Sequence, residues 1–509
     1  MLKNKKRLLW NFAHFTRSRI GCGAPIPGAA NAPDLKRQID ISMKNRIKIY
    51  ALLASASAAF GAETVINYPS GGSLPFDGDT ASLEINIDGD TNGAIVAVGT
   101  NAQIGTPGQD ALTINYNSGT TLNYLSSVGG AGTVAGNIKV NIANGSFNNQ
   151  TSSPAITEAV IGTSYGASSA VVDGSVSVTI GGGEFYGNVF AGGGATVRGD
   201  TSLVITGGTF KAEDGIYAGN SWGGSTLGNA SLKITGGDFS EANVYAGNHR
   251  TASTFPQNTI KGNASLVIEG GTFKNVNGGG TDGYLGSIRK AGKIEGDTSI
   301  IIRANDDIAI NGDINVSSGF VDGNAEVTFV GDAGRLTFAG NVKAASASGT
   351  NASLGGKASV KIGTAEEAFT GDFNAKINDG FSSLEISNAG TEVNFAESFG
   401  VESLSVESGA KIGLAQGTSF EKFSIVFDGE FSGGETVDIA SAFADADTRT
   451  VVLSAIESGA QFTVFGGGQE WSTTFDGGQF SVGAAIPEPS ECAAFLGILA
   501  AALAAARRR

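Results

Sequence analysis

The chain has 509 residues, of which 77 are glycine, only 16% are charged and 41% are hydrophobic. A disordered chain would carry more charge and fewer apolar residues, so this composition favours many short strands joined by tight turns. The formal net charge of −15 argues against nucleic acid or anionic lipid as a partner.

The N-terminal part of the chain reads as a targeting region. Residues 1–42 are basic without a structural pattern, and we interpret them as a misassigned start or an n-region extension. Residues 43–62 read as a secretory signal peptide, with three basic residues ahead of a short apolar run. The run is too short to span a bilayer stably, so we expect cleavage near Gly61 and Ala62.

The body that would remain, residues 63–486, has an unusual set of side chains. It holds 19 basic and 44 acidic residues, a formal charge of about −25, with no Met, no Cys and one His. Internal disulfides, cysteine-based zinc sites and cysteine nucleophiles are therefore excluded in it. Residues 63–130 contain strand-like runs, such as Leu83–Ile87, and are predicted to form an N-terminal β cap.

A short pattern recurs through residues 131–419. It consists of a glycine, a polar residue that is often Asn or Asp, two small residues, and an apolar-x-apolar strand. The clearest copies begin at Gly199, Gly228 and Gly262, and weaker copies begin at Gly136, Gly174, Gly296, Gly323, Gly356, Gly380 and Gly400. Because one strand of this length cannot bury a core by itself, the copies are expected to stack on one another.

Two further blocks follow the first strand in several copies. One ends in Gly-Gly-x-Phe, and the other reads apolar-aromatic-Ala-Gly, with Tyr284-Leu-Gly286 as a degenerate copy. Stacking predicts three ladders of equivalent residues, namely Ile180/Ile205/Ile234/Ile268, Phe185/Phe210/Phe239/Phe273 and Phe190/Tyr217/Tyr245.

The fold class predicted from these blocks is all-β, a parallel β-solenoid in the form of a right-handed β-helix with β caps. The repeat style resembles pectin-lyase-like and autotransporter-passenger solenoids over residues 130–410. An array of β-sandwiches is the alternative. Residues 420–485, with strand-like runs at Phe423–Phe427 and Val451–Leu453, are expected to form a C-terminal β cap.

The last segment, residues 486–509, combines Pro487-Glu488-Pro489, a 15-residue apolar helix that begins at Cys492, and a terminal Arg507-Arg508-Arg509 cluster. The prolines keep the signal extended, and the arginines hold the end of the helix on the cytoplasmic side. Fifteen residues span about 22 Å as a helix, less than a hydrocarbon core of about 30 Å.

This tail resembles the PEP-CTERM sorting tail of Gram-negative bacteria. In that family a membrane exosortase recognises the tail, cuts near the Pro-Glu-Pro signature and passes the protein outward. The resemblance implies that Pro487, Glu488 and Pro489 are recognised and that the arginines stop transfer, after transient insertion into the inner membrane. An ordinary tail anchor is the alternative.

Residues able to carry chemistry are sparse in the body. His249 is interpreted as a solvated loop histidine, and no nucleophile-elbow motif is present. Asp88, Asp90 and Asn92 match the opening of a calcium loop, but position twelve is Gly99, so a turn is favoured over a weak calcium site. No catalytic residue, firm metal ligand or cofactor is predicted. The basic residues are interpreted as scattered, with no charged cluster recurring in register, and they include Arg198, Lys211, Arg250, Arg289, Lys290 and Arg303.

These observations predict a non-enzymatic surface protein with a role in adhesion, matrix formation or envelope structure. Its expected partners are an exosortase-like sorting enzyme and an envelope or extracellular polysaccharide. Its expected location is the cell envelope, the outer surface or the extracellular matrix. The alternative is a carbohydrate-active β-helix enzyme, such as a polysaccharide lyase or glycosidase, or a glycan-binding module.

Overall fold

The structure is a computed structural model that describes residues 63–486, apart from residues 69–73, 90–92, 101, 149–156, 167–168, 213, 253, 283–288, 346–352 and 477. These residues belong to one compact unit, Gly61–Arg509. The predicted signal segment 43–62 and the sorting tail from Pro487 onward lie outside the described residues.

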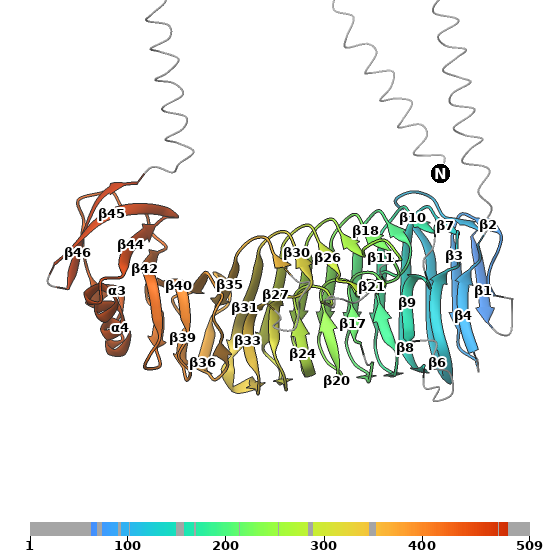
Figure 1. Ribbon diagram of the computed structural model, residues 1–509, viewed down its shortest axis with the longest axis horizontal. Helices are drawn as coiled ribbons and strands as arrows, with labels where there is room; N and C mark the ends of the chain where they lie inside the picture. Colours follow the sequence, from blue (N-terminus) through green and yellow to red (C-terminus); the bar gives the residue numbers. More distant parts are fainter. Residues whose placement is uncertain are drawn as a thin grey trace, which may run out of the picture. The chain divides into compact units, whose positions relative to one another are not determined.

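The body is a stack of parallel coils, which confirms the all-β solenoid class (Figure 1). A first row of strands pairs parallel from coil to coil along the whole stack. Its members are β1 (Thr64–Tyr68), β3 (Leu83–Ile87), β6 (Asp110–Val128), β8 (Asn137–Phe147), β11 (Val176–Ile180), β15 (Thr201–Ile205), β19 (Ala230–Ile234), β23 (Ala264–Ile268), β27 (Thr298–Ala304), β31 (Ala325–Asp332), β35 (Ala358–Ile362), β38 (Ser383–Ile386), β40 (Gly400–Glu407), β42 (Ser419–Phe427) and β44 (Gln461–Gly466).

Two more rows form the other sides of the coils. The second-block row holds β12 (Glu184–Phe185), β16 (Thr209–Phe210), β20 (Asp238–Tyr245), β24 (Gly271–Asn277), β28 (Ile308–Ile310), β32 (Leu336–Phe338), β36 (Phe369–Phe373), β39 (Glu392–Phe395) and β41 (Lys411–Gly413). The third-block row holds β4 (Gly93–Val98), β9 (Glu158–Ser164), β13 (Asn188–Phe190), β17 (Ile216–Tyr217), the ends of β20 and β24, β29 (Ile314–Ser317), β33 (Asn341–Ala345) and β37 (Lys376–Ile377).

A ten-stranded corner sheet of two-residue strands runs beside these rows. Its members are β2 (Asp79–Thr80), β5 (Gln103–Ile104), β7 (Thr133–Val134), β10 (Val171–Val172), β14 (Thr196–Val197), β18 (Ser225–Thr226), β22 (Thr259–Ile260), β26 (Lys293–Ile294), β30 (Phe320–Val321) and β34 (Ser353–Leu354). After β34 the coils are shorter and this corner strand no longer occurs among the described residues.

The three predicted ladders are confirmed. Ile180, Ile205, Ile234 and Ile268 are partners in consecutive strands. The rings of Phe185, Phe210, Phe239 and Phe273 stack face to face with centroids 4.7, 4.4 and 5.2 Å apart. Phe190, Tyr217 and Tyr245 are partners in the third row. The next rung of that ladder is Asn277, and Tyr284-Leu-Gly286, predicted as a degenerate copy, lies outside the described residues.

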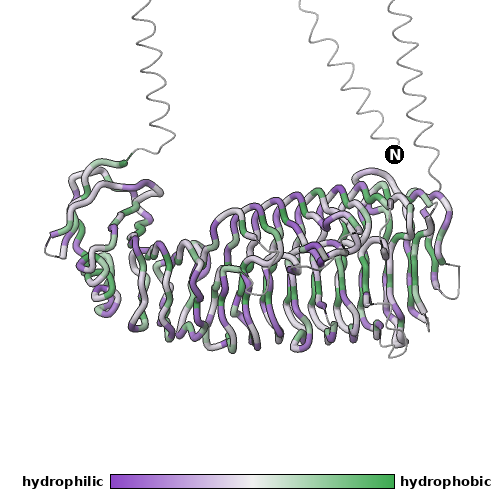
Figure 2. Tube along the Cα trace, in the orientation of Figure 1, coloured by the Kyte–Doolittle hydropathy of each residue, from purple (hydrophilic) through white to green (hydrophobic). Residues whose placement is uncertain are grey.

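Alternation along each strand builds the core. Figure 2 shows hydrophobic and hydrophilic residues alternating along the coils, as expected for strands with one face inward. The inward ladder of the first row is continuous: it passes from Ile66 and Ile85 through Leu232 to Phe423, all buried. Stacking thus buries apolar surface that no single coil could bury alone.

The Gly-Asn/Asp pair of the repeat has a packing explanation at one corner. The side-chain oxygen of Asn229 accepts the backbone N–H of Asn263 at 2.9 Å, and that of Asn263 accepts the N–H of Asp297 at 2.9 Å. A Cβ at Gly262 would lie 2.4 Å from the Oδ1 of Asn229 and 2.8 Å from the carbonyl oxygen of Gly228. Glycine is required there because the polar side chain and backbone of the preceding coil occupy the place of a Cβ.

The same hydrogen bond recurs over seven coil-to-coil steps. In each step a side-chain oxygen accepts the backbone N–H of the equivalent corner residue in the next coil. The residues in order are Asn137, Ser175, Asp200, Asn229, Asn263, Asp297, Asn324 and Lys357. This corner ladder satisfies backbone donors that the turn would otherwise leave without a strand partner.

The two predicted caps differ from each other. Strands β1 and β3, within residues 63–130, stack parallel and in register on β6, so the solenoid architecture already begins there. At the other end, β43 (Thr436–Asp438), β45 (Gln469–Asp476) and β46 (Gln479–Ala485) pair antiparallel. The cap also contains α3 (Ile439–Ala442) and α4 (Ala446–Glu457), while η1 (Ala333–Arg335) is a short 3-10 turn within the stack.

The strand predicted at Val451–Leu453 is wrong, because these residues lie in α4. Asp445 caps the helix by accepting the backbone N–H of Thr448 at 2.7 Å. The hydroxyl of Thr448 in turn accepts the N–H of Ile412 at 2.9 Å, which ties the helix to β41. An N-cap and this tertiary contact outweigh the β propensity of the Thr-Val-Val run.

We predict that Gly262→Ala destabilises the stack. The added Cβ must displace the Asn229 side chain and the backbone of Gly228, which should lower the free energy of unfolding by about 1–3 kcal/mol. Urea denaturation would show this as a lower midpoint. Gly119→Ala is the matched control, because a Cβ at Gly119 would meet no atom within 4 Å. Equal midpoints for the two variants would contradict the packing explanation.

Candidate functional site

An aromatic row lies outside the coil interior. In the third-block strands Val189, Ile216 and Val244 belong to the main core, whereas their neighbours Phe190, Tyr217 and Tyr245 form a separate cluster with Ile161. The rings stack with centroids 5.0 and 4.7 Å apart. All are buried although they face away from the core, so other segments of the chain cover them.

One covering segment is residues 248–258, which we call the strap. It contains β21 (Thr251–Ala252), which pairs antiparallel with β25 (Arg289–Lys290) of the next coil. Asn248 fixes its start: Oδ1 accepts the backbone N–H of Asn220 at 2.7 Å, and Nδ2 donates to the carbonyl of Lys293 at 2.8 Å. The strap is thus bound to the coils on both of its sides.

His249 is the first side chain that the strap places over the aromatic row. It is only 9% exposed, and its ring meets that of Tyr217 edge-on at 5.2 Å. Its Nε2 lies 3.5 Å from Oδ2 of Asp214. The expectation of a solvated loop histidine is therefore wrong. A segment that varies between repeats need not be exposed, because this one folds back onto the coil.

Asp214 is the centre of a buried polar cluster. Its Oδ1 accepts a hydrogen bond from Nη2 of Arg250 at 2.6 Å, and its backbone carbonyl accepts one from the hydroxyl of Tyr217 at 2.9 Å. The hydrogen bond and charge of His249, reinforced by Arg250, hold the pKa of Asp214 far below its ordinary value despite partial burial. Asp214 is therefore a carboxylate at all ordinary pH values.

A second acidic side chain, Glu158, is buried nearby in β9. It is 3% exposed and accepts hydrogen bonds from Nε1 of Trp222 at 3.1 Å and from the backbone N–H of Thr157 at 3.1 Å. Burial raises the pKa of Glu158 above its ordinary value. The two acids thus have opposite pKa shifts, the arrangement by which one site can provide both an acid and a base.

Strand register places the two acids close to each other. Glu158 is the partner of Asn188 in β13, and Asn188 Oδ1 accepts the backbone N–H of Gly215 at 2.9 Å. Asp214 precedes Gly215, so the backbones of Glu158 and Asp214 are two strand spacings apart, about 10 Å. No local pattern marks this pair, because the two residues lie 56 positions apart in segments that do not match between repeats.

A separate groove of about 790 Å³ lies where the corner sheet ends at β34. Leu354, Phe381, Val401 and Phe420 contribute its apolar lining. The charged residues along it are Lys357, Asp379, Glu402 and Glu421. Among the described residues no corner strand follows β34, so the groove lies at the end of the corner sheet.

The basic side chains are more organised than expected. Arg303 donates through Nη1 to Glu269 at 2.9 Å and through Nε to Glu367 at 2.8 Å, and Lys233 lies 3.0 Å from Glu269. These four residues form an ion-pair chain across several coils. Stacking in register explains it, because residues far apart in sequence become neighbours on the outer face.

The remaining predicted site residues are not brought together. Asp88 is exposed directly after β3, while Asp90 and Asn92 lie outside the described residues. Among the described residues no three His, Cys, Asp or Glu side chains stand together as metal ligands. Gly61, Ala62 and the sorting residues also lie outside them, so their roles stay predictions. Within the described part of the chain no helix is both long and apolar enough to cross a membrane.

Comparison with known proteins gave no relative: no protein-family model, curated protein or solved structure matches the chain.

We predict that Asp214→Asn loosens the strap. Removing the charge leaves Arg250 and His249 without their carboxylate, which should lower the free energy of opening the strap by about 2–3 kcal/mol at neutral pH. Hydrogen exchange of residues 248–258 measures this. Asp173→Asn is the control, because the Asp173–Arg198 pair is on the surface and should contribute less than about 1 kcal/mol.

The pH dependence has a definite sign. The folded-state pKa of Asp214 lies below its unfolded value, so the stabilisation is complete above about pH 4 and is lost as the pH falls through the folded value. The difference between wild type and Asp214→Asn should therefore shrink under strong acid. A difference that grows on acidification would contradict the ion-pair assignment.

Proposed function

We propose that the chain is an exported, envelope-sorted surface protein without enzymatic activity that acts in adhesion, matrix formation or envelope structure. The observation that carries the proposal is the continuity of the stack. The first-row strands join coil to coil from β1 to β44, and aromatic and polar side-chain ladders reinforce the middle of the stack. Segments that vary in length, such as the strap, lie on the outside, where a rigid scaffold displays them.

The proposed route to the surface uses both ends of the chain. The segment before residue 63 would direct export, and the Pro487-Glu488-Pro489 signature would be recognised by an exosortase-like enzyme of the inner membrane. The apolar run is short for a permanent span, which supports removal of the tail over lasting anchorage.

Fractionation of cells tests this route. We expect the native protein at the outer surface or in the matrix without its tail. A Pro487→Ala/Pro489→Ala double variant should stay with the inner membrane and keep the tail, because the extended recognition segment is lost. Protease shaving and mass determination of the C-terminus measure both properties. Pro107→Ala, an exposed proline in the body, is the control. A double variant at the surface, processed like the native protein, would exclude the route.

A carbohydrate-active enzyme is the second candidate function. The observation in its favour is the pair of carboxylates whose pKa values are shifted in opposite directions, raised at Glu158 and lowered at Asp214. The hydrogen bonds that both acids make within the protein favour the non-enzymatic function, because these groups already serve the aromatic row and the strap.

Product analysis separates the two functions. The purified protein should release neither reducing ends nor unsaturated uronates from a panel of neutral and acidic polysaccharides. Release by the native protein that falls by about a hundredfold or more in Glu158→Gln or Asp214→Asn would establish the enzyme instead.

A further inference from the structure

Four aromatic side chains form a continuous strip on the outside of the coils. Tyr124, Tyr165, Trp222 and Phe255 contact one another in that order, with ring centroids 4.9, 5.8 and 6.0 Å apart. Each of the four residues is half-buried. Tyr124 and Tyr165 also pack against the buried row of Phe190 and Tyr217, which gives the strip a rigid floor.

The backbone holds Trp222 in an unfavourable conformation. Its φ is +55°, in the left-handed region that bulky side chains rarely adopt. The turn is fixed on both sides: the N–H of Ser221 donates to the carbonyl of Gly193 at 3.2 Å, and the N–H of Gly223 donates to Oδ1 of Asn258 at 2.6 Å. Strain of this kind is retained where a side chain must be presented in one orientation.

A buried carboxylate fixes the orientation of the indole ring. The Trp222 Nε1–H donates to Glu158 beneath the strip, so the polar edge of the ring points inward. Tyr124 and Tyr165 lie close enough to Glu158 for its charge to raise their pKa values, after the larger effect of burial. The strip therefore combines aromatic ring surface with a fixed polar edge at Trp222, the composition of a ligand-binding surface.

The geometry points to a neutral polysaccharide chain as the ligand. The strip crosses several coils, which suits a linear ligand with a repeated unit, and pyranose rings present C–H groups that pack against aromatic side chains. The formal charge of about −25 on residues 63–486 repels acidic glycans and nucleic acids at long range. This inference rests on the proposed surface function and specifies the class of partner that the surface would hold.

Affinity electrophoresis of the purified full chain in mild detergent tests the proposal. The gels contain soluble β-glucan, galactomannan or xyloglucan as neutral polymers, and polygalacturonate or alginate as acidic ones. At least one neutral polymer should retard the native protein. The Tyr165→Ala/Phe255→Ala double variant should bind it roughly tenfold more weakly, since two ring contacts are lost. Tyr186→Ala is the matched control.

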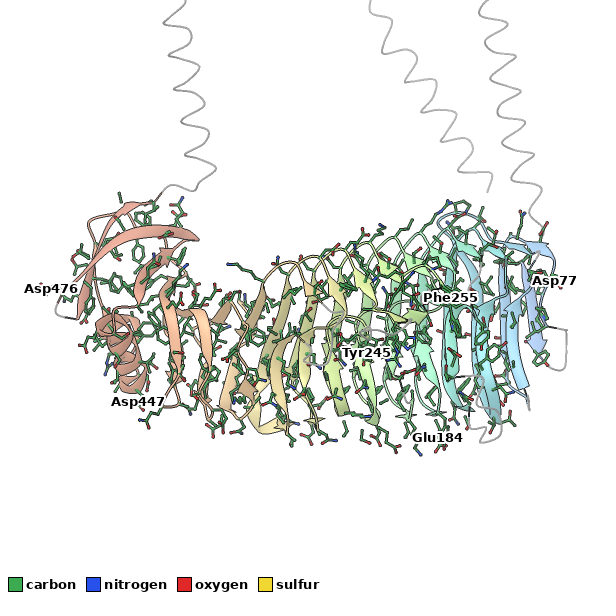
Figure 3. All side chains as sticks on the ribbon, viewed as in Figure 1. Asp77, Glu184, Tyr245, Phe255, Asp447 and Asp476 are labelled. Atoms are coloured by element: carbon green, nitrogen blue, oxygen red, sulfur yellow. The ribbon has the colours of Figure 1, made fainter. Side chains whose placement is uncertain are left out.

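Figure 3 helps to place the variant and its control. Phe255 is labelled over the coils, whereas Glu184, whose carboxylate accepts a hydrogen bond from Tyr186 at 3.1 Å, is labelled at their lower edge. Tyr186 is a half-buried surface tyrosine, like those of the strip, and its ring lies 5.1 Å from the ammonium of Lys211. Replacing Tyr186 by alanine removes an aromatic surface side chain that does not belong to the strip.

Fluorescence of Trp222 gives a second readout that does not depend on how the double variant folds. Addition of the bound polymer should change the emission of the native protein, and Trp222→Phe should abolish that change while Trp10 and Trp471 remain. Absence of retardation by every neutral polymer would overturn the proposal. Equal binding by the double variant, or binding without a Trp222 signal, would also overturn it. None of these binding results changes the expected result of cell fractionation. The proposed glycan binding and the proposed surface function can therefore fail independently of each other.

Discussion

Each coil is hydrogen-bonded in register to the coil before it and the coil after it, and the rest of the structure depends on this contact. The corner where Gly262 lies against Gly228 shows how close the approach is. The N–H of Gly262 donates to the carbonyl of Gly228 at 3.0 Å, and the side chain of Asn229 fills the space beside it. Once backbones meet at this distance, equivalent residues must lie above one another.

Register explains both the core and the outer face. Inside, it aligns residues of similar shape, such as Phe210 and Phe239, into stacked pairs with an interplanar angle of 7°. Outside, it aligns residues of opposite charge, such as Lys261 and Glu295 at 2.6 Å. Surface pairs of this kind contribute little stability, whereas each buried ring adds both apolar area and stacking. The interior ladders are therefore the main source of cohesion between coils.

The outer aromatic row distinguishes this stack from a simple coil, in which side chains outside the core meet solvent. Tyr217 lies on the face that ordinarily meets solvent, yet it is fully buried, because the strap and its neighbours fold back over it. When the strap covers the aromatic row, polar groups beneath it become buried. Asp214 and Glu158 are then needed to accept hydrogen bonds from Arg250 and Trp222. Glu158 thereby also holds the partly exposed indole ring of Trp222 in place.

The parts of the structure that could be predicted from the sequence are those built from residues that recur in each copy of the repeat. Ile205, Phe210 and Tyr217 recur at equivalent places in neighbouring copies, so their ladders could be read from the blocks alone. His249 and Asp214 stand in segments of unequal length, and only the folded register brings them together. Nothing local marks them as partners.

The two ends of the stack are harder to predict from the sequence than its middle. Helix α4 carries a β-branched run that resembles a strand, and it is the cap by Asp445 that favours the helix. The N-terminal strands lack the Gly-Asn pattern and read as a separate cap. Their alternation nevertheless matches that of the later coils, as the pairing of Ile66 with Ile85 shows.

Distances between spin labels test the central claim of in-register stacking most directly. Ser202, Ser231, Ser265 and Ser299 are partners in successive coils, and Ser359 lies two coils further. With Cys22 and Cys492 replaced by serine, paired cysteine labels can be placed at these positions. The stack predicts backbone separations of about 14 Å for Ser202–Ser299 and about 24 Å for Ser202–Ser359, a rise of about 4.8 Å per coil. In-register stacking would be contradicted if the label distances did not increase with the number of coils between them, or if each step added the much larger spacing of separate domains.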